Sequence, residues 1–236
     1  MFSRFGKFFP SARRKANHGA VEAAKNIHST EFEVDTWELS RFVLAKLIPV
    51  VGIHPFPLHE LMLMSAAVCR TRPSQIFDWG THIGKSARIF FECASHFGIA
   101  AEIHSIDLPD DIMHGEHPHE DRGKLVRGIA QVHLHQGDGL DIALNQWSAG
   151  GRKAVPLFFL DGDHSYESVL RELEGIGSAT PDANILLHDA FYQSPDSGYN
   201  VGPHRAIERF MQMNSSRYRR IDSGLGLPGM TFLYRH

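Results

Sequence analysis

A buried strand followed by an amphipathic helix is predicted by the stretch Pro156-Leu-Phe-Phe-Leu-Asp161-Gly-Asp163-His164-Ser-Tyr166-Glu-Ser-Val-Leu170. Its first five residues form an uninterrupted apolar run, which is typical of a strand buried on both faces. From Tyr166 onward the apolar positions follow helical spacing, with charged residues on the other side. Asp161, Asp163 and His164 lie at the junction. In an open parallel sheet, ligands bind outside the carboxyl end of such a strand.

Two interpretations of this junction compete. Two carboxylates and an imidazole beside an apolar core are costly unless a ligand, a metal or a proton compensates them. The alternative is helix capping, in which Asp163 or Ser165 accepts hydrogen bonds from the first free N–H groups. Capping explains one acid but not two, so the pattern favours a functional site.

Composition narrows the class of protein. The 236 residues are 42% hydrophobic and 22% charged, with a net charge of −3, which is typical of a globular protein and does not indicate nucleic-acid binding. Cys69 and Cys93 fall in helical patterns, and with no secretory signal they indicate a reducing cytoplasmic setting. No apolar run approaches the roughly 18–20 residues of a membrane span. We expect a cytoplasmic protein with a small-molecule substrate and no integral membrane segment; a homo-oligomer is compatible with the sequence.

Strands and helices alternate between residues 74 and 213, which predicts an α/β, Rossmann-like fold with helices on both faces of a mostly parallel sheet. The link 223–229 is too short for a crossover helix, so the last strand should be antiparallel. The seven expected strands are Gln75–Asp78, Ala101–Asp107, Val132–His135, Pro156–Leu160, Asn184–His188, Tyr218–Asp222 and Met230–Tyr234.

The chain before the first strand divides into two segments. Residues 1–30 begin with a basic stretch that predicts a flexible tail, or a segment that touches a membrane surface or a partner. Residues 31–72 predict a helical lid or extension, with one helix capped by Asp35 and a second from Leu58 to about Arg70. We expect residues 31–236 to form a single domain whose core spans 73–236.

A loop with two glycines, Gly80 and Gly84, follows the first strand. Glycine lets the backbone approach a ligand closely. The Gly80-x-x-x-Gly84 spacing differs from the Gly-x-Gly-x-x-Gly of dinucleotide binders, which disfavours a nicotinamide-dependent oxidoreductase. The next two strands are also followed by acids. Asp107 is placed for a ribose diol and Asp138 for an adenine amino group, and the alternative role of each is capping.

These motifs resemble class I S-adenosylmethionine-dependent O-methyltransferases, over roughly residues 74–236. The similar branch is the metal-dependent one that includes the macrocin O-methyltransferases and the cephalosporin hydroxylase-like family. The resemblance implies a seven-stranded sheet and methyl transfer to a hydroxyl of a sugar or a hydroxylated natural product. It rests on Asp78-x-Gly80-x-x-x-Gly84-x-Ser86, Asp107, Leu160-Asp161-Gly-Asp163-His164-x-Tyr166 and Leu187-His188-Asp189.

The resemblance also implies a role for each site residue. The cofactor, S-adenosylmethionine, would have Asp78 near its amino group and Asp107 at its ribose. Its methionine end would be lined by Gly80, Thr81, Gly84 and Ser86. Asp161 and Asp189 would match metal-binding acids, His188 is a further candidate ligand, and Asp163 would be the base, with His164 as its substitute.

One departure from the family concerns the metal. Several relatives have a carboxylate or Asn beside the second acid, whereas here Asp189 is preceded by His188. Magnesium prefers oxygen ligands and imidazole suits manganese, iron or zinc better. Either His188 is not a ligand, or the divalent metal, expected to be magnesium or manganese, need not be magnesium. Metal assistance is favoured because an aspartate alone is a weak base for an alcohol, whose pKa a metal ion can lower.

Other segments leave their roles open. The His-rich loop 114–119 is a second metal site, a substrate lid or a solvated loop. The polar segment Tyr192–Asn200 is a candidate wall of the acceptor site. A non-catalytic binding protein on a methyltransferase scaffold is the alternative function, because fold does not determine function.

Overall fold

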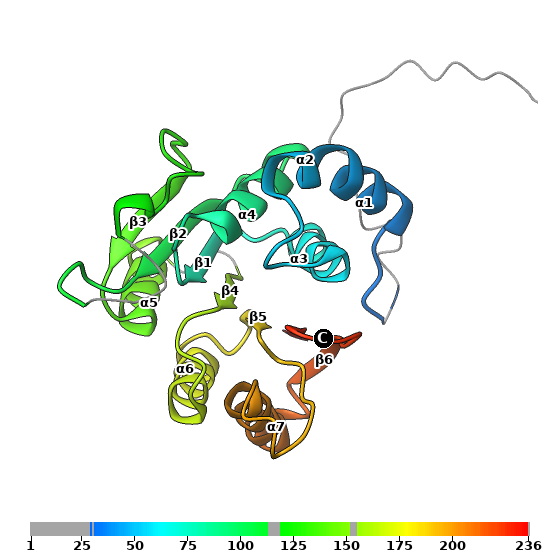
Figure 1. Ribbon diagram of the computed structural model, residues 1–236, viewed down its shortest axis with the longest axis vertical. Coiled ribbons are helices and arrows are strands. Elements are labelled where there is room, and N and C mark those ends of the chain that lie inside the picture. Colours follow the sequence, from blue (N-terminus) through cyan, green and yellow to red (C-terminus); the bar gives the residue numbers. More distant parts are fainter. Residues whose placement is uncertain (1–28, 30, 113–118, 152–154, 236) are drawn as a thin grey trace, which may run out of the picture.

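A computed structural model describes residues 29, 31–112, 119–151 and 155–235 (Figure 1). Nearly all of the basic N-terminal segment and of the loop 114–119 lies outside the described residues, so the expectations for both stay predictions. Within the described ranges, no helix has the length and apolar character needed to cross a membrane.

One sheet of seven strands forms the centre of the fold, in the order β3-β2-β1-β4-β5-β7-β6. β7 is antiparallel to both of its neighbours and all other pairs are parallel. The predicted mostly parallel sheet with an antiparallel last strand is therefore confirmed. The strands are β1 (Gln75–Trp79), β2 (Glu102–Asp107), β3 (Val132–Gln136), β4 (Leu157–Leu160), β5 (Asn184–His188), β6 (Tyr218–Ser223) and β7 (Met230–Arg235).

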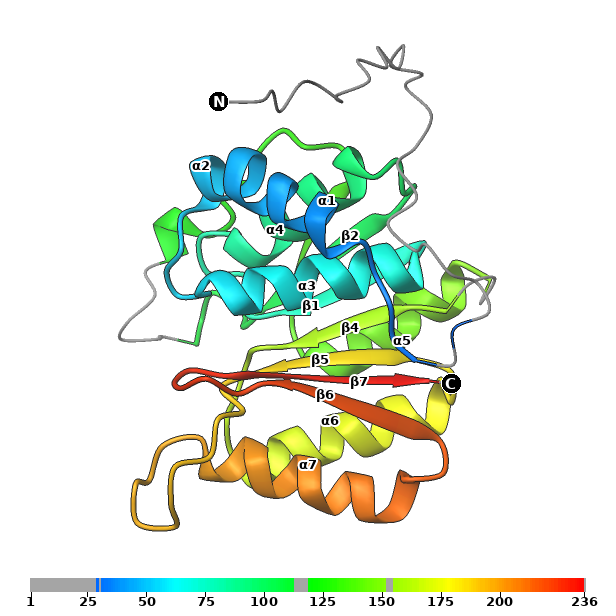
Figure 2. The ribbon, with the colours of Figure 1, turned by 90° about the vertical axis from the view of Figure 1, so that its right-hand side faces the viewer.

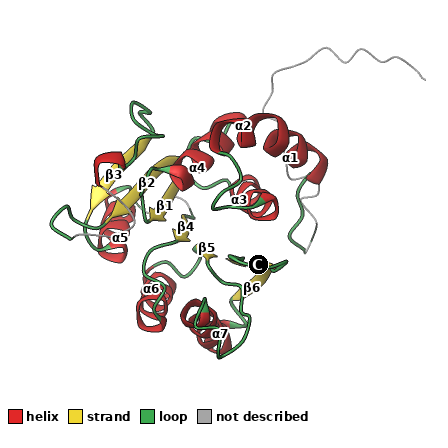
Figure 3. Ribbon diagram, in the orientation of Figure 1, coloured by secondary structure: helices red, strands yellow, loops and turns green. Residues whose placement is uncertain are grey.

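Helices cover both faces of the sheet, as expected (Figures 2 and 3). Alternate strand residues point to opposite faces, so Ile76 packs in one apolar cluster and Phe77 in the other. One face carries α1 (Thr36–Phe42), the π-helical turn η1 (Val43–Leu47), α2 (Ile48–Val51), α3 (Leu58–Thr71) and α4 (Lys85–His96). The other carries α5 (Gly139–Ala149), α6 (Tyr166–Ala179) and α7 (Val201–Asn214), and a short 3₁₀ turn, η2, spans His119–Asp121.

The helices before β1 pack on the sheet. Asp35 caps α1 by accepting hydrogen bonds from the backbone N–H groups of Trp37 and Glu38, each at 3.2 Å. Leu61 and Met64 of α3 are fully buried in the cluster that also contains Phe232 of β7. Helices lie where the sequence predicts them before β1, and α3 contacts β5 and β7, which border the candidate site. The role of residues 31–72 as a lid or extension stays a prediction.

The strand order reverses direction at β1, because β2 lies on one side of β1 and β4 on the other. Such a switch point leaves a crevice at the carboxyl ends of the strands. The loops after β1 and β4 meet there. At Gly80, with φ +83°, a β-carbon would lie 2.4 Å from the carbonyl oxygen of Asp161, so only glycine fits this approach.

Candidate active site

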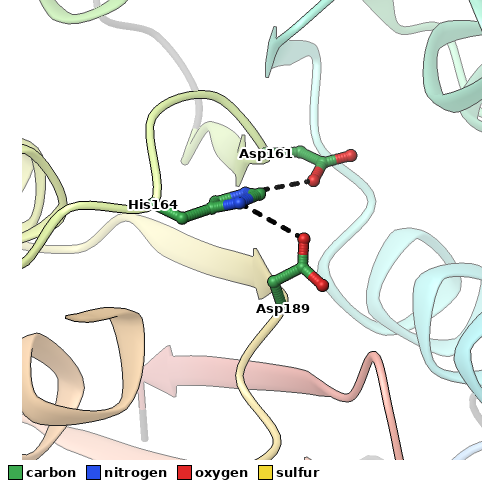
Figure 4. Close-up of side chains that lie close together, drawn as sticks. All are labelled: Asp161, His164 and Asp189. Carbon is green, nitrogen blue, oxygen red and sulfur yellow. Dashed lines mark ion pairs between the residues drawn. The ribbon is translucent and has the colours of Figure 1, made fainter. Parts of the chain in front are cut away.

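Three side chains converge at the carboxyl ends of β4 and β5 (Figure 4). The imidazole of His164 lies between two carboxylates, with Nε2 3.7 Å from Asp161 Oδ1 and Nδ1 3.4 Å from Asp189 Oδ2. One oxygen or nitrogen atom from each residue lies within 4.8 Å of the others. This spacing allows the three atoms to approach a single cation. We refer to Asp161, His164 and Asp189 as the site triad.

The fold accounts for this convergence. β4 and β5 are adjacent and parallel, so the acids that follow them, Asp161 and Asp189, emerge at the same edge. Asp189 has φ +53°, a left-handed conformation that aspartate tolerates better than most residues and that often marks functional positions. His164 directly precedes Ser165, the N-cap of α6, whose hydroxyl accepts a hydrogen bond from Ser168 N at 3.3 Å.

Asp163, the predicted base, lies apart from the site triad. It is exposed, and its carboxylate accepts hydrogen bonds from Ser165 N at 3.0 Å and from Ser165 Oγ at 2.9 Å. Both contacts are to Ser165, the N-cap of α6, so Asp163 holds the capping residue and does not itself cap the helix. Of the two candidate bases in the junction, His164 is the one that contacts the other predicted site residues.

His188 lies behind the site triad, between two carboxylates. Its Nδ1 is 2.9 Å from Asp161 Oδ1 and its Nε2 is 3.1 Å from Oε2 of Glu60, a fully buried residue of α3. Glu60 Oε1 also accepts a hydrogen bond from Gly229 N at 2.8 Å. Because both ring nitrogens have partners, the geometry favours His188 as an orienting group for Asp161. Its role as a metal ligand stays a prediction.

The charges in this cluster shift one another's proton affinity. Burial opposes the charged form of His188, but the attraction of Asp161 and hydrogen bonds to Asp161 and Glu60 outweigh it and raise its pKa to about 10. The hydrogen bond to Asp161 raises the pKa of His164. Burial raises the pKa of Asp189, whereas for Asp161 the two histidines overcome the burial penalty and lower the pKa. The acids and histidines therefore form a coupled set of charges.

Asp78, the acid near the end of β1, is fully buried beside the glycine loop. Its Oδ2 accepts a hydrogen bond from Ser105 Oγ at 2.7 Å, and Ser105 Oγ is 2.9 Å from Thr81 Oγ1. Burial raises the pKa of Asp78 to about 8. Its Oδ1 has no hydrogen-bond partner among the described residues. A buried carboxylate oxygen without a partner is costly, which favours a ligand donor at this point. Ser86 is also buried, in the first turn of α4.

Asp107 already has protein partners. Its carboxylate accepts hydrogen bonds from Leu108 N at 2.9 Å, His82 N at 3.3 Å and Arg122 Nε at 3.0 Å. A carboxylate offers about four acceptor positions, so one stays available for a ribose hydroxyl. Arg122, which the sequence pattern did not single out, also donates to Leu108 O and anchors the segment after β2.

Asp138 shows the contacts of a capping residue. Its Oδ1 accepts a hydrogen bond from Asp141 N at 3.0 Å at the start of α5, and its Oδ2 pairs with Arg171 at 2.8 Å. The pair with Arg171 lowers the pKa of this acid. The proposed contact with adenine stays a prediction.

Comparisons with known proteins bear on this site. Residues 77–190 match a family model described as a methyltransferase domain. No curated protein is similar enough in sequence to match. The matched segment includes the glycine loop, the acids after β2 and β3 and the whole site triad.

Several solved structures share the fold. An O-methyltransferase from Bacillus cereus in complex with S-adenosylhomocysteine (SAH) is 16% identical, with a TM-score of 0.53 over 86% of this chain and 92% of that one. TomG from Streptomyces achromogenes, an O-methyltransferase of tomaymycin synthesis in complex with S-adenosylmethionine (SAM), is 18% identical, with a TM-score of 0.52 over 85% and 88%. CalS11, a TDP-rhamnose 3′-O-methyltransferase of calicheamicin biosynthesis, is 16% identical, with a TM-score of 0.51 over 84% and 92%.

At these identities the solved structures show the shared fold, and the family match adds the domain type. The methyltransferase-domain match over residues 77–190 spans the glycine loop and the site triad on this shared fold, and together these findings support a SAM-dependent methyltransferase.

Proposed function

We propose that the chain transfers a methyl group from SAM to a hydroxyl of a sugar or a hydroxylated natural product, with a divalent metal ion bound by the site triad. The observation that carries this proposal is the convergence of Asp161, His164 and Asp189 beside the glycine loop. The acceptor class rests on the resemblance to sugar and natural-product O-methyltransferases.

The residues at the end of β1 and β2 fit the cofactor. Asp78, whose pKa burial raises to about 8, offers a buried carboxyl oxygen without a hydrogen-bond partner among the described residues. It can accept a hydrogen bond from a cationic amino group, whose charge would favour the ionised carboxylate. Gly80 keeps the loop backbone close to the Asp161 loop. Asp107 retains acceptor capacity for a ribose hydroxyl. When bound, SAM supplies a methyl group on a positively charged sulfur.

The site triad fits a divalent ion by its chemistry. It offers two carboxylates and one imidazole, a mixed oxygen and nitrogen set that suits manganese, iron or zinc better than magnesium. A divalent ion held there would lower the pKa of an acceptor hydroxyl. His188 and Glu60 lie behind the triad and would hold Asp161 in its orientation through the 2.9 Å contact.

His164 is the candidate for proton transfer from the acceptor, through the ring nitrogen that would not bind the metal ion. It is partly exposed, whereas Asp161 and Asp189 on either side orient its ring. A proton acceptor must reach the reacting hydroxyl directly or through one water molecule, and Asp163 is already bound to Ser165. We therefore favour His164 over Asp163 in this role.

A pocket next to Asp189 is the candidate acceptor site. It has a volume of about 260 Å³, and the rings of Tyr192 and His204, which stack 4.3 Å apart, contribute to its wall. Arg220, Asp222 and Ser223 add polar groups. Flat rings beside hydrogen-bonding side chains fit a polyhydroxylated acceptor. Tyr192 begins the segment Tyr192–Asn200, which the sequence suggests as a wall of the acceptor site, and its place in this pocket supports that role.

The proposal is tested by methyl transfer to a panel of sugar nucleotides and polyphenols, with and without EDTA. We expect activity that EDTA abolishes and Mn²⁺ restores. Asp189→Asn should reduce the rate at least 100-fold without unfolding the protein. Asp182→Asn is the matched control, because Asp182 pairs with Arg235 at the other end of the sheet.

Cofactor binding is measured separately, by the thermal shift that SAH produces. We expect SAH to raise the melting temperature and Asp107→Ala to remove most of the shift. If SAH raises the melting temperature of the wild type but EDTA does not change its activity, the role of the metal ion is rejected. The assignment as a methyltransferase is then retained. Equal activity of Asp189→Asn and wild type would reject the role of the site triad.

A further inference from the structure

A row of stacked rings crosses four strands on the face of the sheet that α5 and α6 cover. Phe158, Phe77, His104 and His133 are successive register partners on β4, β1, β2 and β3. Neighbouring ring centroids are 5.2, 5.1 and 5.1 Å apart, with interplanar angles of 21–27°. The row changes from phenyl rings to imidazoles as it approaches the edge strand, so it ends in groups that can bind metal ions.

A third imidazole, that of His135, faces His104 at this edge of the sheet. His135 lies two residues after His133, on the same face of β3, and its Nε2 is 3.1 Å from Nδ1 of His104. His104 is only 7% exposed, and its Nε2 has no hydrogen-bond partner among the described residues. His133 Nε2 is 2.7 Å from a carboxylate oxygen of Glu102. The edge therefore holds two facing ring nitrogens with a carboxylate nearby.

Burial favours the neutral form of both facing imidazoles. Burial, followed by repulsion from the other two histidines, lowers the pKa of His104 to about 4. Burial also lowers the pKa of His135. Neutral imidazole is the form that binds metal, so no proton has to leave.

The spacing fits two ligands of one ion. Bonds of about 2.0–2.1 Å to a common ion place two nitrogens about 3.1 Å apart when they meet at roughly 100°, between square and tetrahedral angles. In the metal-free pair one ring donates its N–H to the other. Rotation of the half-buried His135 ring would open the pair, and His104 would then carry its proton on Nε2.

We propose that His104 and His135 chelate a divalent transition-metal ion that prefers nitrogen ligands, such as Zn²⁺ or Ni²⁺, at the β2–β3 edge. The adjacent Glu102 carboxylate adds favourable charge and water completes the coordination. This site is separate from the site triad, whose acids lie at the carboxyl ends of β4 and β5. An ion bound by His104 and His135 would link β2 to the edge strand β3 and so stabilise the folded form.

The test is a Ni²⁺ titration of the full chain by calorimetry. The chain holds 16 histidines, so only the difference between variants is informative. To silence the site triad, all variants carry Asp189→Asn. We expect His135→Gln to lose one equivalent of bound Ni²⁺, or to bind it at least tenfold more weakly, and to lose part of the Ni²⁺-dependent rise in melting temperature.

His96→Gln is the matched control, because His96 is an exposed histidine of α4 on the opposite face of the sheet. It should leave the stoichiometry unchanged. His104→Gln should reproduce the loss, and if it unfolds the protein, His135→Gln alone decides. Unchanged Ni²⁺ stoichiometry and affinity in His135→Gln would overturn the proposal, as would an equal loss in the control.

Discussion

Glu60 is a buried acid that connects the N-terminal helices to the site. It is fully buried, and its two oxygens contact His188 Nε2 at 3.1 Å and Gly229 N at 2.8 Å. A carboxylate in this position is tolerated because a cationic imidazole and a backbone donor compensate it. Its removal should therefore affect both stability and the orientation of Asp161.

We predict that Glu60→Gln lowers the free energy of unfolding by about 2–4 kcal/mol, because it leaves the His188 charge partly unpaired. Urea unfolding at pH 7 measures the change. The half-buried Glu38, which pairs with the exposed Arg41 on α1, provides the control, and Glu38→Gln should cost less than about 1 kcal/mol. Equal effects of the two substitutions would contradict the pairing of Glu60 with a charged His188.

Glu172 on α6 gives a prediction of pH dependence. This residue is 6% exposed, and burial raises its pKa from 4.5 to about 8. Below pH 4.5 the folded and unfolded states both hold the proton, so no penalty exists. Between pH 4.5 and 8 only the unfolded state ionises readily, and the penalty for folding grows by up to about 1.4 kcal/mol per pH unit.

Glu172→Gln should therefore stabilise the protein at pH 8, by about 1–3 kcal/mol after allowance for relaxation, and have little effect at pH 4.5. The measurement is urea unfolding of both proteins at the two pH values. A gain of the same size at both would show that Glu172 is not held protonated in the folded state.

At the residue level, the sequence predicted which side chains follow the strands but not how they pair. Asp161, His164 and Asp189 could be predicted together because they follow adjacent parallel strands. Glu60 could not, since its partners are 128 and 169 residues away along the chain. The available signal was an acid beside the apolar residues of α3. The sequence could not show which of Asp163 and His164 points toward the site, because the direction of each side chain depends on the turn that joins β4 to α6.

At the level of elements, β4 and β5 were the most predictable strands because each contains an apolar run bounded by turns. Such runs are buried on both faces, as β4 and β5 are. The pattern did not reveal α5, a helix of 11 residues that starts at a glycine and buries only three side chains. The start of α5 depends on the cap that Asp138 provides and on packing against the sheet. The apolar pattern of the sequence shows neither.

The connection between β6 and β7 depends on one glycine. Gly229 has φ +81°, and a β-carbon there would lie 2.4 Å from Phe191 Cβ. The connection also accepts hydrogen bonds from the segment after β5, from Ala190 N to Gly229 O at 3.0 Å and from Phe191 N to Pro228 O at 3.1 Å. Gly128 has nearly the same φ, +82°, with nothing within 4 Å of its β-carbon position.

These two glycines form a matched pair. We predict that Gly128→Ala costs about 1 kcal/mol, the strain of the left-handed backbone alone. Gly229→Ala should cost at least about 2 kcal/mol more, because Phe191 must also move, and should lower methyl-transfer activity by displacing the Glu60 contact. Urea unfolding and initial rates measure both effects. Equal stability of the two variants would show that the connection adapts to the added methyl group.

For the molecule as a whole, the main consequence of the topology is that four acids meet at one edge of the sheet. Asp78, Asp107, Asp161 and Asp189 lie at the carboxyl ends of β1, β2, β4 and β5. Under the proposed function, this edge holds a sulfonium and a divalent cation at the same time. Like charges repel, and the repulsion is stronger where water is excluded. The acids offset this repulsion but do not abolish it.

This arrangement predicts that the metal changes the preference between substrate and product cofactor. SAM carries a positive sulfur and SAH a neutral one, so Mn²⁺ should raise the ratio of Kd for SAM to Kd for SAH severalfold. Calorimetric titrations of both cofactors with and without Mn²⁺ measure the ratio. Asp189→Asn, which weakens the metal site, should remove the Mn²⁺ effect while the variant still binds SAH. A ratio that stays constant although Mn²⁺ binds to the wild type would place the metal and the sulfur too far apart to interact, and would contradict the shared acidic edge on which the proposed mechanism depends.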